Sequence, residues 1–207
     1  AETRANGRGS GVGVLLHSMS LPMGSRLEGL MYRRATVLCA MSRYTLQRIV
    51  EQHDIDASRV VLLPHPPSPY YLSALSERKT HPTLHRTAFG SELRLLFVGR
   101  LDDPRKGVAE LLGAVCQARA QGISAVLTLI GPCSAAWRSR FSSLIQDSRA
   151  RLLGQVDLNQ LAEEYLLHDA FVLPSRQEGF GIVIAEAFHA GLPVISTRCG
   201  GPEDVIR

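Results

Sequence analysis

The chain has 207 residues, of which 45% are hydrophobic and 20% are charged. This balance is typical of a folded globular protein with one or two domains, and it excludes a chain that is disordered throughout. No uninterrupted apolar run reaches the roughly 18 residues of a membrane-spanning helix, so we expect no transmembrane segment.

The formal net charge is +4, and Lys79 and Lys106 are the two lysines among 23 cationic residues. The excess of arginine reflects either the base composition of the source genome, which we favour, or the binding of planar oxyanions. The basic residues are scattered and no basic run interleaves with aromatic residues. The sequence therefore predicts no nucleic-acid partner.

Cys39, Cys116, Cys133 and Cys199 show no C-x-x-C spacing. A disulfide framework or a zinc site needs clustered ligands, so we expect reduced, buried thiols in a cytoplasmic protein. Residues 1–10 are polar and contain neither an initiator methionine nor the apolar core of a signal peptide. We therefore expect a truncated chain.

Short apolar runs alternate with helical patterns in residues 1–63, which we interpret as part of one α/β domain. Its predicted strands are 12–16, 36–40 and 60–63, with one helix from about Arg26 and a second helix capped by Ser42. Residues 64–91 contain five prolines and almost no periodicity. Such a long irregular stretch favours an interdomain linker with some local structure.

From residue 92 onward the alternation is regular. Continuous apolar strands are predicted at 93–98, 125–130, 151–153, 170–173 and 194–196. Between them, helical spacing recurs from Val108 to Val115 and from Trp137 to Ile145, and Asp157 caps a further helix. Apolar strands separated by helices predict a doubly wound parallel sheet covered on both faces.

In open parallel sheets, ligands bind beyond the carboxyl ends of the strands. The loop 99–107, after the first strand of this sheet, presents Arg100, Arg105 and Lys106 beside a helix N-terminus. This arrangement predicts either a phosphate or diphosphate site or a solvated turn. We interpret Asp102 and Asp103 in the same loop as turn and helix-entry residues.

The loop 174–181 and the helix after it carry two carboxylates, Glu178 and Glu186. Glu186 lies in a helix that is apolar nearly all round, so we expect a polar partner for it. If one helix held both residues, they would be about 12 Å apart. That exceeds the roughly 5–9.5 Å of a glycosidase pair and favours a longer ligand that contacts both. Gly179 and Gly181 permit close approach of a ligand to the backbone.

The strings L-L-F-V-G-R-L-D-D-P-R-K-G (95–107) and E-G-F-G-I-V-I-A-E-A-F-H-A-G-L-P-V-I-S-T-R-C-G-G-P-E-D-V-I (178–206) resemble the family-four retaining glycosyltransferases of the GT-B fold. The resemblance covers about 12–207 and implies two Rossmann-like doubly wound domains, both truncated. Residues 1–63 would be the C-terminal part of the acceptor-side domain and 64–91 the interdomain linker. Residues 92–207 would be the nucleotide-sugar-binding domain, incomplete at its end.

The resemblance also implies roles for individual residues. The implied catalytic residues are Glu178, Arg100, Lys106 and His17, and the implied donor-binding residues are Glu186, Gly179, Phe180, Gly181 and Gly99. Glu186 would accept hydrogen bonds from the ribose hydroxyls, and Glu178 from hydroxyls of the donor sugar. Arg100 and Lys106 would neutralise the diphosphate. His17, which follows the first predicted strand, is either structural or, as we favour, a residue on the acceptor side of the active site.

The implied reaction transfers a sugar from a nucleotide-diphosphate donor to an unknown saccharide, lipid or small molecule, with retention and without a metal or cofactor. Alternatives are an inactive nucleotide-sugar-binding domain, an epimerase acting on a nucleotide sugar, and a non-enzymatic interaction module. We expect these 207 residues alone to bind nucleotide weakly and to transfer no sugar. Arg26, Arg33 and Arg34 lie in a basic amphipathic helix, which is either an ordinary surface helix, as we favour, or a peripheral contact with an anionic cytoplasmic membrane face.

Overall fold

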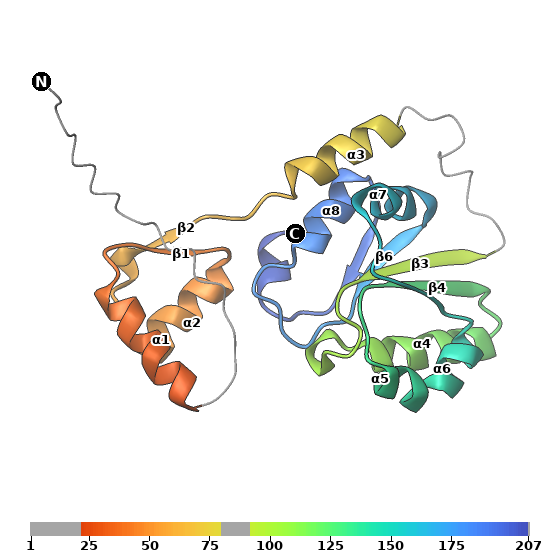
Figure 1. Cartoon of the computed structure of the whole chain (residues 1–207), viewed down its shortest axis with the longest axis horizontal. Helices are drawn as coiled ribbons and strands as arrows, with labels where there is room; N and C mark the ends of the chain where they lie inside the picture. The colour runs from red at the N-terminus through yellow and green to blue at the C-terminus, as the bar shows by residue number, and fades with distance from the viewer. Residues whose placement is uncertain (1–21, 80–91, 207) are drawn as a thin grey trace, which may run out of the picture.

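The computed structural model describes residues 22–79 and 92–206, the first five of them as backbone only, and contains two parallel sheets (Figure 1). The strands are β1 (Leu38–Ala40), β2 (Val60–Leu62), β3 (Leu93–Val98), β4 (Ala125–Ile130), β5 (Arg151–Gly154), β6 (Ala170–Leu173) and β7 (Val194–Ser196). The helices are α1 (Pro22–Arg34), α2 (Arg43–His53), α3 (Pro69–Lys79), α4 (Val108–Ala120), α5 (Ala135–Arg140), α6 (Ser142–Ser148), α7 (Leu158–Leu167) and α8 (Ile182–His189). Single 3-10 turns are η1 (Ala57–Arg59), η3 (Pro104–Lys106) and η4 (Gly201–Asp204).

The larger sheet has the strand order β5-β4-β3-β6-β7, with every neighbouring pair parallel. The chain leaves β3 toward β4 and β5 on one side and returns through α7 to β6 on the other. The boundary between β3 and β6 is therefore the switch point, where open α/β sheets form a crevice beyond the strand ends. The predicted doubly wound architecture is confirmed for this part of the chain.

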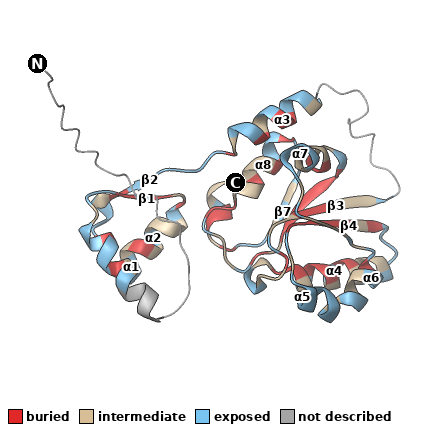
Figure 2. Cartoon of the chain, viewed as in Figure 1, coloured by how far each residue is buried: buried red, intermediate tan, exposed pale blue. Residues whose placement is uncertain are grey.

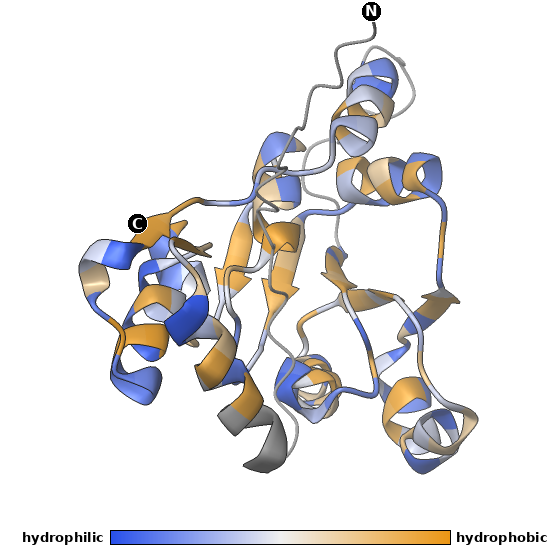
Figure 3. Ribbon diagram, turned by 60° about the vertical axis from the view of Figure 1, so that its left-hand side comes forward, coloured by the Kyte–Doolittle hydropathy of each residue, from blue (hydrophilic) through white to orange (hydrophobic). Residues whose placement is uncertain are grey.

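Two helical layers cover this sheet, with α4, α5 and α6 on one face and α3, α7 and α8 on the other (Figure 1). The buried interior follows the strands, which are also its most hydrophobic part (Figures 2 and 3). Among the fully buried side chains are Leu96, Phe97, Leu127, Leu129, Phe171 and Leu173. Because both faces are covered, these strands are continuous apolar runs, which is why the sequence located them.

The predicted helix from Trp137 to Ile145 is two helices, α5 and α6, that meet at Phe141. Phe141 has φ −106° and ψ 16°, outside helical geometry, so the helix cannot run through it. Trp137 and Phe141 still share a face, with ring centroids 5.1 Å apart, and both pack against the main core. Apolar spacing alone therefore predicted which side chains face the core but not that the helix is interrupted at Phe141.

The smaller sheet pairs β1 with β2 in parallel, in the register Leu38 to Val60. The apolar side chains of this unit come together as Tyr32, Leu38, Ala40, Ile49, Ile55 and Val60. Ser42 caps α2 as predicted, because its hydroxyl accepts a hydrogen bond from the Thr45 amide. Both strands end within one or two residues of their predicted limits, whereas the predicted strand 12–16 lies outside the described residues.

Helix α3 lies inside the segment that the sequence predicts as a linker. Tyr71, Ala74 and Leu75 on this helix are buried in the core of the larger sheet. Arg78 of α3 donates to Glu163 Oε1 (2.9 Å) and Asn159 Oδ1 (2.9 Å) on α7. The helical spacing of 71, 74 and 75 is visible in the sequence, but four prolines just before these positions obscure it.

The expectation of buried thiols is correct for Cys199 and wrong for Cys39, which is exposed. Side chains alternate along a strand, so Leu38 and Ala40 face the core of the small sheet and Cys39 faces away from it. Cys116 and Cys133 are half-buried, and all four thiols are free.

Over the described residues, no helix is both long enough and apolar enough to cross a membrane. The basic helix predicted near the N-terminus is α1, which exposes Leu27, Leu30 and Met31. Arg33 and Arg34 in its last turn are exposed as well. Peripheral membrane contact by this surface stays a prediction.

Candidate functional site

The loops after β3 and β6 meet at the switch point, and a glycine allows the contact. Gly107 has φ +66°, and a Cβ atom there would lie 2.2 Å from the carbonyl oxygen of Pro174. A hydrogen bond of 2.7 Å from the Arg176 amide to the Arg105 carbonyl joins the same loops. Any other residue at position 107 would push the two loops apart, so this glycine is required for the loops of the candidate site to meet.

Lys106 and Glu178 are brought together by this contact, 72 residues apart in sequence. Lys106 Nζ lies 2.6 Å from Glu178 Oε1, and the Ser175 hydroxyl donates to the same oxygen at 2.7 Å. The side chains of Lys106 and Glu178 are 23% and 11% exposed, so water screens the pair only in part. The site therefore holds one fixed cation beside one fixed carboxylate.

The backbone of Glu178 is fixed by the loop after β7. Its amide donates to the Cys199 carbonyl and its carbonyl accepts from the Gly201 amide, both at 2.9 Å. Glu178 and Gly200 form a parallel bridge beyond the end of the sheet. This pairing explains how a loop residue keeps a defined position without lying in a strand.

Helix α8 begins at Ile182, after Gly181 with φ +82°. Glu178 is thus outside the helix, and the 12 Å separation that assumed one helix for Glu178 and Glu186 does not apply. Phe180 is buried and Gly179 is exposed beside it. The N-terminus of α8 follows these residues directly, so its amides lie next to Glu178 in the chain.

Glu186 is half-buried on α8, and a tyrosine supplies the polar partner that the sequence requires. The Tyr165 hydroxyl on α7 donates to Glu186 Oε2 at 3.0 Å. Burial raises the pKa of Glu186 above its usual range, and the hydrogen bond from Tyr165 offsets part of that rise. Sequence reasoning missed Tyr165, although a tyrosine on the apolar face of a predicted helix is a signal that its hydroxyl needs a partner.

The remaining predicted residues are placed as follows. Gly99 continues the end of β3, where its amide donates to the Ile130 carbonyl at 2.9 Å, and Arg100 follows it with an exposed side chain. Arg105 forms a bidentate pair with Asp103, with a shortest distance of 2.7 Å. This pairing lowers the pKa of Asp103, which also caps η3, as its interpretation as a helix-entry residue predicted. His17 lies outside the described residues.

Helix α2 of the small sheet reaches the loop of the candidate site. The hydroxyls of Ser42 and Thr45 both donate to the Gly179 carbonyl, Thr45 at 3.0 Å. The Gln177 side-chain amide donates to the Tyr44 hydroxyl at 3.1 Å. These contacts link the two sheets across more than 130 residues of sequence, a separation at which local pattern carries no information.

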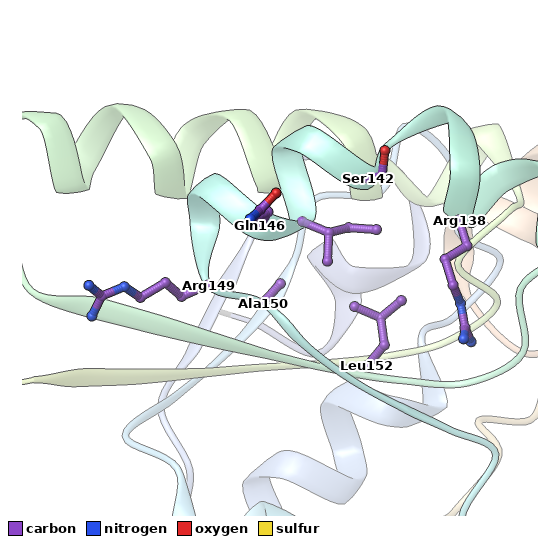
Figure 4. A pocket seen from close by; sticks show the side chains of 7 residues that line it. Arg138, Ser142, Gln146, Arg149, Ala150 and Leu152 are labelled. Atoms are coloured by element: carbon purple, nitrogen blue, oxygen red, sulfur yellow. The ribbon is translucent and has the colours of Figure 1, made fainter.

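A pocket lies away from the switch point, between α6 and β5 (Figure 4). It is a shallow pocket of about 460 Å³, lined by Arg138, Ser142, Ile145, Gln146, Arg149, Ala150 and Leu152. Arg138 and Arg149 lie at opposite ends of it (Figure 4). None of the predicted site residues lines this pocket, so it is separate from the candidate site. Within 22–79 and 92–206, no three His, Cys, Asp or Glu side chains converge in a way that could hold a metal.

Residues 92–207 match the family model described as "Glycosyl transferases group 1". A phosphatidyl-myo-inositol mannosyltransferase of Mycobacterium leprae is 32% identical over 138 residues, which cover 66% of this chain and 34% of that protein. The family match thus covers all five strands of the larger sheet.

Two examples illustrate the solved structures that share the fold. Sucrose-phosphate synthase from Thermosynechococcus elongatus has a TM-score of 0.71 and 25% identity, covering 89% of this chain and 46% of its own. Alr3699/HepE of Anabaena, solved with UDP and glucose, has a TM-score of 0.68 and 19% identity, covering 89% and 50%. The likeness agrees with the predicted GT-B architecture, and the chain spans half or less of the length of these proteins.

Proposed function

We propose that this chain, which belongs to the group 1 glycosyl transferases, carries the nucleotide-sugar donor site of a retaining glycosyltransferase. The observation that carries the proposal is the pairing of Lys106 with Glu178 at the carboxyl ends of β3 and β6. A cation and a carboxylate fixed at a switch point match the two halves of the donor, an anionic diphosphate and a polyhydroxylated sugar.

Cleavage of the bond between the sugar and the diphosphate leaves both bonding electrons on the phosphate oxygen. The negative charge that develops there is stabilised by cations held in place before the reaction starts. Lys106 is the fixed cation, and Arg100, just after β3, is exposed and would contact the same phosphates. The amides at the N-terminus of α8, which follow Glu178 closely in the chain, would add partial positive charge.

Glu178 has the complementary task of accepting hydrogen bonds from the donor sugar. Its Oε1 already accepts from Lys106 and Ser175, so the carboxylate is held in one orientation. Glu186, further along α8, would accept from the ribose hydroxyls of the nucleotide. This assignment places the sugar before the start of α8 and the nucleoside along it.

Retention of the anomeric configuration and independence from a divalent metal are parts of this proposal, and the family resemblance supports both. Lys106 and Arg100 would supply the charge stabilisation that a metal would otherwise provide. The acceptor is a saccharide, lipid or small molecule, and the four free cysteines favour a cytoplasmic setting. A nucleotide-sugar epimerase is the second candidate, which an altered sugar nucleotide in the absence of any acceptor would reveal.

Calorimetric titration of the chain with UDP, GDP and ADP tests the proposed site. Glu186→Ala should raise the dissociation constant about tenfold to a hundredfold, since hydrogen bonds to a charged group contribute about 1.5–3 kcal/mol. Arg149→Ala, in the pocket between α6 and β5, is the control and should leave the affinity unchanged. Failure of all three nucleotides to bind, or a loss of affinity only in Arg149→Ala, would contradict the proposal.

A further inference from the structure

Tyr165 is a fully buried residue whose hydroxyl points at the one carboxylate of α8. Its oxygen lies 3.0 Å from Glu186 Oε2 and 3.2 Å from the carbonyl oxygen of Val183. A phenol has one proton to donate, and an ionised carboxylate is a stronger acceptor than a carbonyl. The proton is therefore directed at Glu186.

The ring of Tyr165 is held on two sides by other aromatic rings. The Tyr71 ring meets it edge-on, with centroids 5.7 Å apart, and the Phe171 ring lies 5.8 Å away. All three residues are 0% exposed. The hydroxyl consequently sits at a fixed point in space, and the Glu186 side chain is restrained by it.

Tyr71 provides a natural comparison within the same cluster. Its hydroxyl also donates to residue 186, but to the backbone carbonyl, at 3.0 Å. Tyr71 and Tyr165 therefore share burial, ring packing and a hydrogen bond to the same residue. They differ in whether the hydrogen bond reaches the group that would contact a ligand.

We infer that Tyr165 is a positioning residue that orients the Glu186 carboxylate to receive the nucleotide, an inference that rests on the proposed donor site. A glutamate on a half-exposed helix face otherwise samples several rotamers, and binding must then immobilise it. Tyr165 fixes the carboxylate in advance. The nucleotide then meets an acceptor that is already oriented.

The same contact makes nucleotide binding depend on pH in a defined way. The titratable groups that face the carboxyl are Tyr165 from α7 and Tyr71 from α3. Burial raises the pKa of Glu186 and the Tyr165 hydrogen bond lowers it. A protonated carboxyl is a weaker acceptor, so nucleotide affinity falls as pH drops through this pKa. Without the Tyr165 hydroxyl the pKa rises further, and the loss of affinity begins at a higher pH.

The test is a set of calorimetric titrations with UDP, GDP and ADP at several pH values, using the full chain, Tyr165→Phe and Tyr71→Phe. Tyr165→Phe should weaken binding about threefold to tenfold at neutral pH and move the acidic loss of affinity to higher pH. Tyr71→Phe should lower the melting temperature and leave both the affinity and its pH profile as in the parent chain. Protonation of the nucleotide itself affects all three titrations equally.

A double variant separates positioning from general damage to the core. In the Glu186→Gln background, which removes the titrating group, Tyr165→Phe should cause no further shift of the pH profile. Equal affinities and pH profiles for the parent chain and Tyr165→Phe would overturn the inference and leave the proposed function standing. Equal losses in the two phenylalanine variants would also overturn it. Failure of the parent chain to bind any of the three nucleotides would refute the proposed function itself.

Discussion

Replacing Tyr71 by alanine measures how strongly α3 is tied to the core of the larger sheet. The Tyr71 ring is 0% exposed, packs edge-on against Tyr165 and donates a hydrogen bond to Glu186. Truncation of a large buried aromatic side chain lowers the free energy of unfolding by about 3–5 kcal/mol. Tyr70, the preceding residue on the same helix, is 78% exposed, so Tyr70→Ala should change it by no more than about 0.5 kcal/mol.

Urea unfolding followed by tryptophan fluorescence reports on the relevant core. Trp137 is the single tryptophan of the chain and packs against that core from the opposite helical layer. With a urea dependence of about 1–3 kcal/mol per molar, Tyr71→Ala should lower the unfolding midpoint by at least about 1 M. Tyr70→Ala should move it by less than about 0.5 M. Similar midpoints for the two variants would refute the assignment of α3 to this core.

Three further outcomes follow from the same contacts. Gly107→Ala should destabilise the chain by more than about 1 kcal/mol in thermal melts and weaken UDP binding, because the new Cβ would clash with Pro174 and displace Lys106. Its control, Gly113→Ala in α4, has open space around the new Cβ and should stabilise the chain by about 0.5–1 kcal/mol. Burial lowers the pKa of His168, whose Nδ1 lies 2.6 Å from the Glu164 carbonyl oxygen, so the contribution of His168 to stability is complete above the ordinary histidine pKa of about 6.5 and is lost as pH falls toward the folded-state pKa. His168→Gln should therefore reduce the loss of unfolding free energy below about pH 6.5 in urea titrations, and an unchanged pH dependence would contradict this assignment. Nucleotide binding should be the same in EDTA as in Mg²⁺, and binding that EDTA abolishes and Mg²⁺ restores would contradict the metal-independent site.

The sequence predicted the central strands of the larger sheet, β3, β4 and β6, because burial on both faces makes them continuous apolar runs. β3 and β4 begin and end at the predicted residues, and glycine or proline soon follows each of them. Which strands pair with one another was not predictable from the apolar pattern. The position of β6 beside β3 depends on the packing of the whole sheet, and the pairing of Lys106 with Glu178 follows from that position.

The hydrogen-bond partner of Glu186 was likewise not predictable from the sequence pattern. An unpaired carboxylate in an apolar helix implies a polar partner, and the structure supplies Tyr165 from a helix 21 residues earlier in sequence. Tyr71 comes from the segment interpreted as a linker, where prolines obscured the helical spacing. The local sequence pattern identified Glu186 as a residue that needs a partner, whereas the identity of the partner, Tyr165, depends on how the helices pack.

The most direct test of the account is the location of bound UDP on the chain, measured by amide chemical-shift changes during a titration. The account predicts that the largest changes occur at Lys106, in the loop from Glu178 to Gly181, and around Glu186. Residues of the pocket between α6 and β5, such as Arg149 and Leu152, should not respond. Changes confined to that pocket, with none at the ends of β3 and β6, would contradict the central claim that the nucleotide binds at the switch point of the larger sheet.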